Sequence, residues 1–207
     1  MKLGGTKIIT HTLHRKGKEN DLKQDYVLLA MFASGINDNY DDSRQKLMKI
    51  AEIMNNHNPV NIMPKFGWSV SSTITATFDN IETVKQVIRE LKEEDFGISI
   101  VISGLISEIK NVLKDLNLDI HTVHFSLGGN FGRKELLPNE KILEITTMCG
   151  HHTVSPQSIS SYVELIKRGK MTLEKAAEKL TRPCVCGIVN TSRVLKILNS
   201  LVKEYKS

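Results

Sequence analysis

The chain has 207 residues, of which 25% are charged and 40% hydrophobic, and it carries a net charge of +5. This composition is ordinary for a soluble globular protein. No stretch approaches the about 18 consecutive apolar residues of a membrane helix, and the first residues lack the apolar centre of a signal peptide, so we expect a cytoplasmic protein without membrane contact. Three cysteines cannot close a disulfide framework, which agrees with a reducing compartment.

The charge is distributed unevenly along the chain. Residues 1–132 have a balance of −1, whereas residues 133–207 have a balance of +6 and contain every cysteine. A positive field attracts anions, so we expect a small anionic ligand or substrate; a solvated face of Lys-rich helices would give the same pattern. The basic segment contains only two aromatic residues, Tyr162 and Tyr205, so we do not expect a base-stacking surface for nucleic acid.

Residues 26–127 alternate between strand and helix patterns. The predicted strands are Tyr26–Ala33, Val60–Phe66, Ser71–Phe78, Ile98–Ile102 and Asp119–Leu127. The second and third strands are separated by a turn at Gly67-Trp68. Helices are expected up to Asn56 with an N-cap at Asp41 or Asp42, after the N-cap Asn80, and over Leu105–Leu116.

The predicted order β-α-β-β-α-β is the split arrangement of ferredoxin-like domains. We therefore expect an α/β (α+β) fold, in which a ferredoxin-like sheet is extended by an αβ unit and is followed by a helical C-terminal region. Ile8–Leu13 can join an edge of the sheet. The predicted domains are residues 1–130 and residues 131–207. This topology occurs in regulatory ligand-binding domains of the ACT type and in many enzymes, so it favours no single function.

A glycine-rich basic segment joins the two predicted domains. It contains Gly128, Gly129, Gly132, Arg133 and Lys134. Its backbone amides and two cations can wrap an anion. The spacing matches neither the dinucleotide fingerprint nor the phosphate loop, and a plain linker is the favoured interpretation.

The C-terminal region is predicted to be helical from Ile142 onward. Ser155-Pro156 begins a helix that ends at Gly169, Thr172 caps a second helix that ends before Pro183, and the last helix begins at Thr191 or Ser192. The first two of these helices form an antiparallel hairpin. Such a hairpin returns the chain to its starting end, so we expect the turns on either side of it to meet.

Those two turns hold all three cysteines. Cys149 is followed by Gly150, His151 and His152, and the second turn contains Cys184 and Cys186. Nearby cations and the N-terminus of the last helix favour thiolates. Three thiolates and one imidazole, from His151 or His152, suit a zinc site, and three thiolates alone suit a 4Fe-4S cluster. Buried inert cysteines and a redox pair formed by Cys184 and Cys186 are the alternatives.

Two further histidine pairs, His11/His14 and His121/His124, lie in predicted strands. Residues three apart on a strand point to opposite faces, so neither pair can chelate a metal on one face. We expect His124 to be the better candidate for an acid–base role, because it lies near the end of its strand and next to the glycine-rich segment.

The sequence thus predicts a metal-dependent enzyme that acts on a small anionic substrate. Cys149, Cys184, Cys186 and His151 are the candidate ligands, and His151, His152 and His124 are the candidate acid–base residues. Gly128, Gly129, Gly132, Arg133, Lys134 and Arg193 are the candidate anion-binding residues. The alternative is a non-enzymatic, dimeric ACT-like module with a structural metal or inert cysteines.

Overall fold

The computed structural model describes residues 15–33, 35–120 and 134–204. Within them lies one sheet of four strands, β1 (Tyr26–Met31), β2 (Asn61–Ile62), β3 (Thr73–Phe78) and β4 (Ser99–Ser103). The strand order is β2-β3-β1-β4, and every neighbouring pair is antiparallel. The fold class is therefore mixed α+β.

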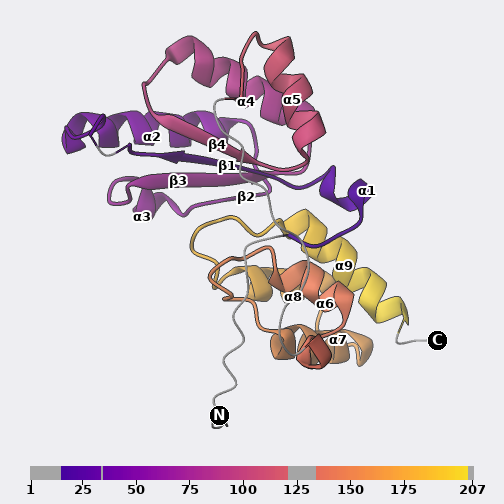
Figure 1. Ribbon diagram of the computed structural model, residues 1–207. Helices are drawn as coiled ribbons and strands as arrows, with labels where there is room; N and C mark the ends of the chain where they lie inside the picture. The colour runs from indigo at the N-terminus through magenta and orange to yellow at the C-terminus, as the bar shows by residue number, and fades with distance from the viewer. Residues whose placement is uncertain (1–14, 34, 121–133, 205–207) are drawn as a thin grey trace, which may run out of the picture.

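The helices fall into two groups along the chain. In the N-terminal part they are α1 (Glu19–Leu22), α2 (Tyr40–Asn56), α3 (Lys65–Trp68), α4 (Ile81–Glu94) and α5 (Ile106–Asp115). In the C-terminal part they are the short 3-10 helix η1 (Lys134–Leu136), α6 (Glu140–Thr146), α7 (Pro156–Lys167), α8 (Leu173–Thr181) and α9 (Thr191–Glu204). Figure 1 shows α6 to α9 as one group below the sheet, and α4 and α5 above it.

The first hydrophobic core lies between one face of the sheet and helices α2 and α4. Successive strand residues point to opposite faces, so Leu28 and Ala30 of β1 share this face with Ile74 and Ala76 of β3. Their partners on the helices recur at helical spacing and are Leu47, Ile50, Ala51, Met54, Val84, Val87, Ile88 and Leu91.

A second, separate core is formed by α6 to α9. It is aliphatic and includes Ile145, Ile159, Leu198 and Leu201, each with at most 1% of its surface exposed. The hairpin predicted from the sequence is present as α7 and α8, which pack against each other and against α9. Gly169, with φ of 67°, follows α7 and allows the reversal.

Residues 183–190, which we call the Cys184 loop, attach the C-terminal helices to the sheet. On the face opposite the first core, the Thr75 and Thr77 hydroxyls donate hydrogen bonds to the carbonyl oxygens of Cys186 and Gly187. At the β2 edge, Asn61 Nδ2 donates to the Val189 carbonyl at 2.9 Å. The backbone of this loop is therefore held by side chains of β2 and β3.

A buried ionic cluster forms a second attachment. Asp25, which has no exposed side-chain surface, pairs with Arg15 and, at 2.8 Å, with Arg193. Arg193 is 3% exposed and also pairs with Glu144 of α6 at 3.2 Å. The Asn190 side chain donates to the Gln24 carbonyl at 2.7 Å and accepts the Arg193 amide at 2.9 Å, which caps α9.

The structure confirms three N-caps expected from sequence, and Asn80 offers a clean test of their strength. Asn80 Oδ1 accepts the amides of Glu82 at 2.7 Å and Thr83 at 3.3 Å. Asn80→Ala leaves both amides without this acceptor, so we expect a loss of about 1 kcal/mol in the free energy of unfolding, measured by urea denaturation. Gln86→Ala, on an exposed position of α4, is the control and should leave stability within about 0.5 kcal/mol. If the two substitutions lowered the free energy of unfolding equally, the Asn80 side chain would not act as a cap.

Two local predictions are wrong. The strand predicted over Val60–Phe66 contains only the two residues of β2, and the predicted turn at Gly67-Trp68 is part of α3. The helical turn of α3 accompanies the burial of Trp68, whose Nε1 donates to the Met63 carbonyl at 2.8 Å. Asn39, rather than Asp41 or Asp42, caps α2.

Several predictions fall outside the described residues. They are the strand Ile8–Leu13, all but the first two residues of the strand Asp119–Leu127, and the glycine-rich segment up to Arg133. Asp119 and Ile120 are described and lie in no strand. The division into domains 1–130 and 131–207 stays a prediction.

Candidate functional site

The structure brings the two cysteine-containing turns together. Cys149 lies in the turn between α6 and α7, and its thiol is hydrogen-bonded to that of Cys184. Cys186 Sγ lies 3.4 Å from Nδ1 of His151, which belongs to the same turn as Cys149. Two segments about 35 residues apart therefore meet through two side-chain pairs.

The three thiols are free and differ in their access to solvent. Cys149 and Cys184 are 1% and 6% exposed, and both belong to the second core. Cys186 is half-buried and its neighbour His151 is exposed. The cluster is thus closed on the side of the helices and open at the pair of Cys186 and His151.

Backbone amides surround both buried sulfurs. The amides of His151 and Thr153 donate to Cys149, and the Thr153 hydroxyl lies 3.1 Å from the same sulfur. The amides of Ile188 and Val189 donate to Cys184. Amide donors of this kind stabilise negative charge on sulfur and orient a thiolate that ligates a metal.

These contacts shift the pKa values of the three thiols differently. The Cys184 hydrogen bond, followed by the Thr153 and His151 donors, lowers the pKa of Cys149 despite its burial. The hydrogen bond to Cys149 and burial raise the pKa of Cys184, and burial together with the nearby Cys149 charge raises the pKa of Cys186. The buried pair of Cys149 and Cys184 therefore titrates as one unit, in which a first negative charge is favoured and a second is disfavoured.

The turn that follows Cys149 has an unusual backbone at His152. Its φ of 55° lies in the left-handed region, which is uncommon for a residue with a side chain. The His152 amide donates to the Cys149 carbonyl at 3.0 Å, which closes the turn. This geometry directs His151, rather than His152, to the Cys186 sulfur.

The residues of the cluster are paired, and are not arranged around one point. Within the described ranges, no group of three or more His, Cys, Asp or Glu side chains has the arrangement that holds a metal ion. The contacts join Cys149 to Cys184 and Cys186 to His151. Metal binding at these four residues would require the two pairs to turn towards a common centre.

The other predicted site residues are not part of this cluster in the described structure. The charge of Arg193 is balanced by Asp25 and Glu144 inside the protein. Lys134 lies in η1, and its side chain is outside the described part. The remaining predicted residues, His124, Gly128, Gly129, Gly132 and Arg133, lie outside the described residues. Their predicted roles remain untested.

A hollow of about 390 Å³, which we call the β2–α8 groove, lies beside the cysteines. The N-terminal part supplies Asn61, Ile62 and Pro64, and the end of α8 and the Cys184 loop supply Glu178, Thr181, Arg182, Cys184 and Val185. The sequence analysis missed this groove, because its two walls are more than 100 residues apart. The adjacency of Arg182 and Cys184 in the chain was the one available signal.

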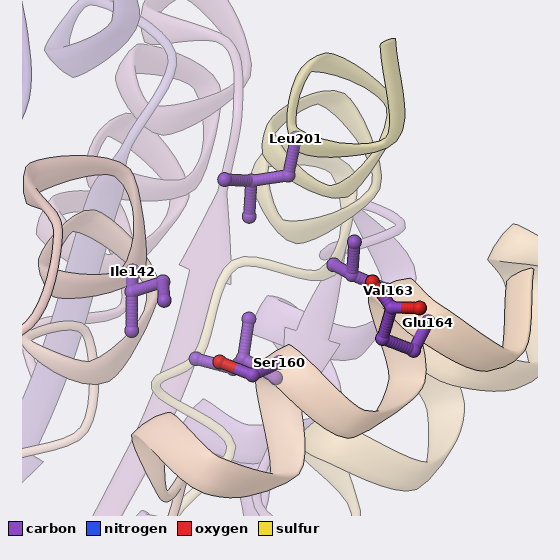
Figure 2. Close-up of a pocket in the computed structure, with 6 residues that line it drawn as sticks. Ile142, Ser160, Val163, Glu164 and Leu201 are labelled. Carbon is purple, nitrogen blue, oxygen red and sulfur yellow. The ribbon is translucent and has the colours of Figure 1, made fainter. Parts of the chain in front are cut away.

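A smaller hollow of about 90 Å³ lies among α6, α7 and α9. In Figure 2, Ile142, Val163 and Leu201 border it from these three helices, with Ser160 and Glu164 also on α7. Its walls are mainly aliphatic and contain no cysteine or histidine, so it is a packing gap in the second core and offers no evident chemistry.

Comparisons with known proteins complete this description. No protein-family model, curated protein or solved structure matches the chain. In the part of the chain that the structure describes, no helix has both the length and the apolar character needed to cross a membrane. Function therefore has to be inferred from the residues of this chain.

Proposed function

We propose that the protein binds a metal centre, either zinc or an iron–sulfur cluster, through Cys149, Cys184 and Cys186, with His151 as the fourth ligand. The observation that carries this proposal is the meeting of the two cysteine turns, in which Cys149 contacts Cys184 and Cys186 contacts His151. If the cysteines were buried only as small apolar side chains, nothing would require a histidine beside the Cys186 sulfur.

The donor set fits both kinds of centre. Three thiolates and one imidazole complete the four-coordinate shell of zinc. The same three thiolates can hold a 4Fe-4S cluster whose fourth iron is bound by the histidine or left open. The amides on the Cys149 and Cys184 sulfurs support either thiolate centre. Free thiols also suit the reducing compartment implied by the predicted cytoplasmic location.

An enzymatic role follows if one metal position stays open to substrate. The metal would then act as a Lewis acid on a carbonyl or hydroxyl oxygen of a small anionic substrate. The exposed position of His151 suits it either as a ligand or as a proton carrier at this open side.

The proposal is tested by purifying the full chain without oxygen and measuring zinc, iron, sulfide and the visible spectrum. We expect one metal centre per chain, and at least a severalfold lower metal content in Cys149→Ser, Cys184→Ser and Cys186→Ser. Met148→Leu is the matched control, because Met148 is buried next to Cys149 and has no place in the ligand set. Wild-type protein with neither zinc nor iron near one equivalent would refute the proposal.

A second candidate function is a non-enzymatic ligand-binding module, with which the strand order is compatible, as it is with many enzymes. The antiparallel order β2-β3-β1-β4, with α2 and α4 on one face, supports the proposal of a ferredoxin-like arrangement. In such a module the cysteine region would be structural and the sheet would serve ligand binding in a homodimer. A closed four-ligand metal site and a dimer in sedimentation experiments would favour this module. An open metal position would favour the enzyme.

A further inference from the structure

We propose that the β2–α8 groove binds a small organic carboxylate, with the carboxylate group on Arg182 and an apolar body against Ile62, Pro64 and Val185. This inference deepens the proposed function and rests on it in one respect: the groove places the anion beside Cys184, a proposed metal ligand. In this proposal Arg182, rather than Arg193, is the cation that binds the ligand.

Arg182 is the charged group of the groove that is open to a ligand. It is exposed at the end of α8, and it makes no ion pair with any residue that the structure describes. Its guanidinium offers two parallel N–H donors that match the two oxygens of a carboxylate. Arg193, in contrast, is buried and already paired with two carboxylates.

The other polar side chains of the groove are engaged within the protein. Glu178 accepts a hydrogen bond from Lys175 at 2.7 Å, and Asn61 donates to the Val189 carbonyl at 2.9 Å. Thr181 donates to the Ala177 carbonyl at 2.9 Å. These groups leave Arg182 to determine where an anion binds.

The size and the walls of the groove indicate the rest of the ligand. A volume of about 390 Å³ falls within the range of sites for small molecules. Ile62, Pro64 and Val185 line it, and Val185 is 60% exposed although it is aliphatic. Covering this side chain with a hydrocarbon removes apolar surface from water. A short aliphatic carboxylate satisfies both the cation and the apolar wall.

Glu178 favours a monocarboxylate over phosphate. The Glu178 carboxylate lines the same groove. The positive charges of Lys175 and, to a smaller extent, Arg182 lower its pKa. A dianion would be repelled by Glu178 more strongly than a monoanion. We therefore expect an organic carboxylate to bind more tightly than inorganic phosphate, which shares only the negative charge.

The test is calorimetric titration of the full chain with hexanoate, acetate, hexanamide and inorganic phosphate. We expect hexanoate to bind most tightly, with acetate weaker for lack of an apolar body and hexanamide weaker for lack of charge. Arg182→Gln should weaken hexanoate binding about tenfold or more. Lys179→Gln is the matched control on the exposed side of α8, and should change the affinity by less than about twofold.

Equal hexanoate affinity in wild type and Arg182→Gln would overturn this inference, and so would binding of hexanamide or phosphate as tight as that of hexanoate. Metal analysis of the same preparations separates this outcome from failure of the proposed function. A full metal content without Arg182-dependent binding rejects the groove alone. Arg182-dependent binding of hexanoate by a wild-type chain that contains no metal rejects the metal centre alone.

Discussion

Gly187→Ala should destabilise the protein by about 2–5 kcal/mol and release the Cys184 loop from the sheet. Gly187 has a φ of 69°, a conformation that costs an L-residue free energy. A Cβ atom at this position would also overlap the backbone of Ile62 and Met63 at the edge of β2. Backbone atoms cannot rotate away as a flexible side chain can, so the loop or the strand has to move.

Gly169→Ala is the matched control for this change. Gly169 has nearly the same φ, 67°, and a Cβ there would meet no atom within 4 Å. It should therefore show only the conformational cost, about 1–2 kcal/mol, in urea denaturation. The difference between the two variants measures how closely the loop approaches β2. If both changes cost the same, the close approach is absent in solution. Metal content should fall in Gly187→Ala alone, because Cys184 and Cys186 belong to this loop.

Asp25→Asn should cost about 3–5 kcal/mol of unfolding free energy. The Asp25 carboxylate is fully buried between Arg15 and Arg193. Removing its charge leaves the guanidinium groups of Arg15 and Arg193 with one carboxylate, that of Glu144, among the described residues of the cluster, and an uncompensated buried charge is costly. Chemical denaturation followed by circular dichroism measures the loss.

Asp42→Asn is the control for Asp25→Asn. Asp42 pairs with Lys46 at 2.7 Å on the surface of α2, where about half of the Asp42 side chain is exposed. Water screens this pair, so its removal should cost less than about 1 kcal/mol. Comparable losses in the two variants would show that Asp25 does not link α9 to the start of β1.

The elements that were predicted correctly have local causes. The apolar run that begins at Tyr26 forms a buried strand, and the side chains of Asn80, Ser155 and Thr172 cap the helices that follow them. These signals depend on neighbours in the chain. The end of β2 and the helix α3 depend instead on the burial of Trp68 against the first core, which no local pattern of residues 60–66 contains.

The same distinction applies to the candidate site. The meeting of the cysteine turns could be predicted, because it requires only that α7 and α8 form a hairpin. The role of Arg193 could not be judged from sequence, since its buried partner Asp25 lies 168 residues away. Likewise, the groove at Arg182 exists only because β2 packs against the loop that carries Cys184.

The Cys184 loop has a thermodynamic consequence for the whole molecule. Its carbonyl oxygens bond to Asn61, Thr75 and Thr77, while its side chains include two of the three thiols. This short loop thus both attaches the C-terminal helices to the sheet and carries two of the three cysteines. A metal or ligand that binds only the folded loop stabilises the folded state by mass action, so it should raise the melting temperature of the sheet and of the C-terminal helices. Loss of that metal or ligand should weaken the attachment of the loop to the sheet as well as the candidate site.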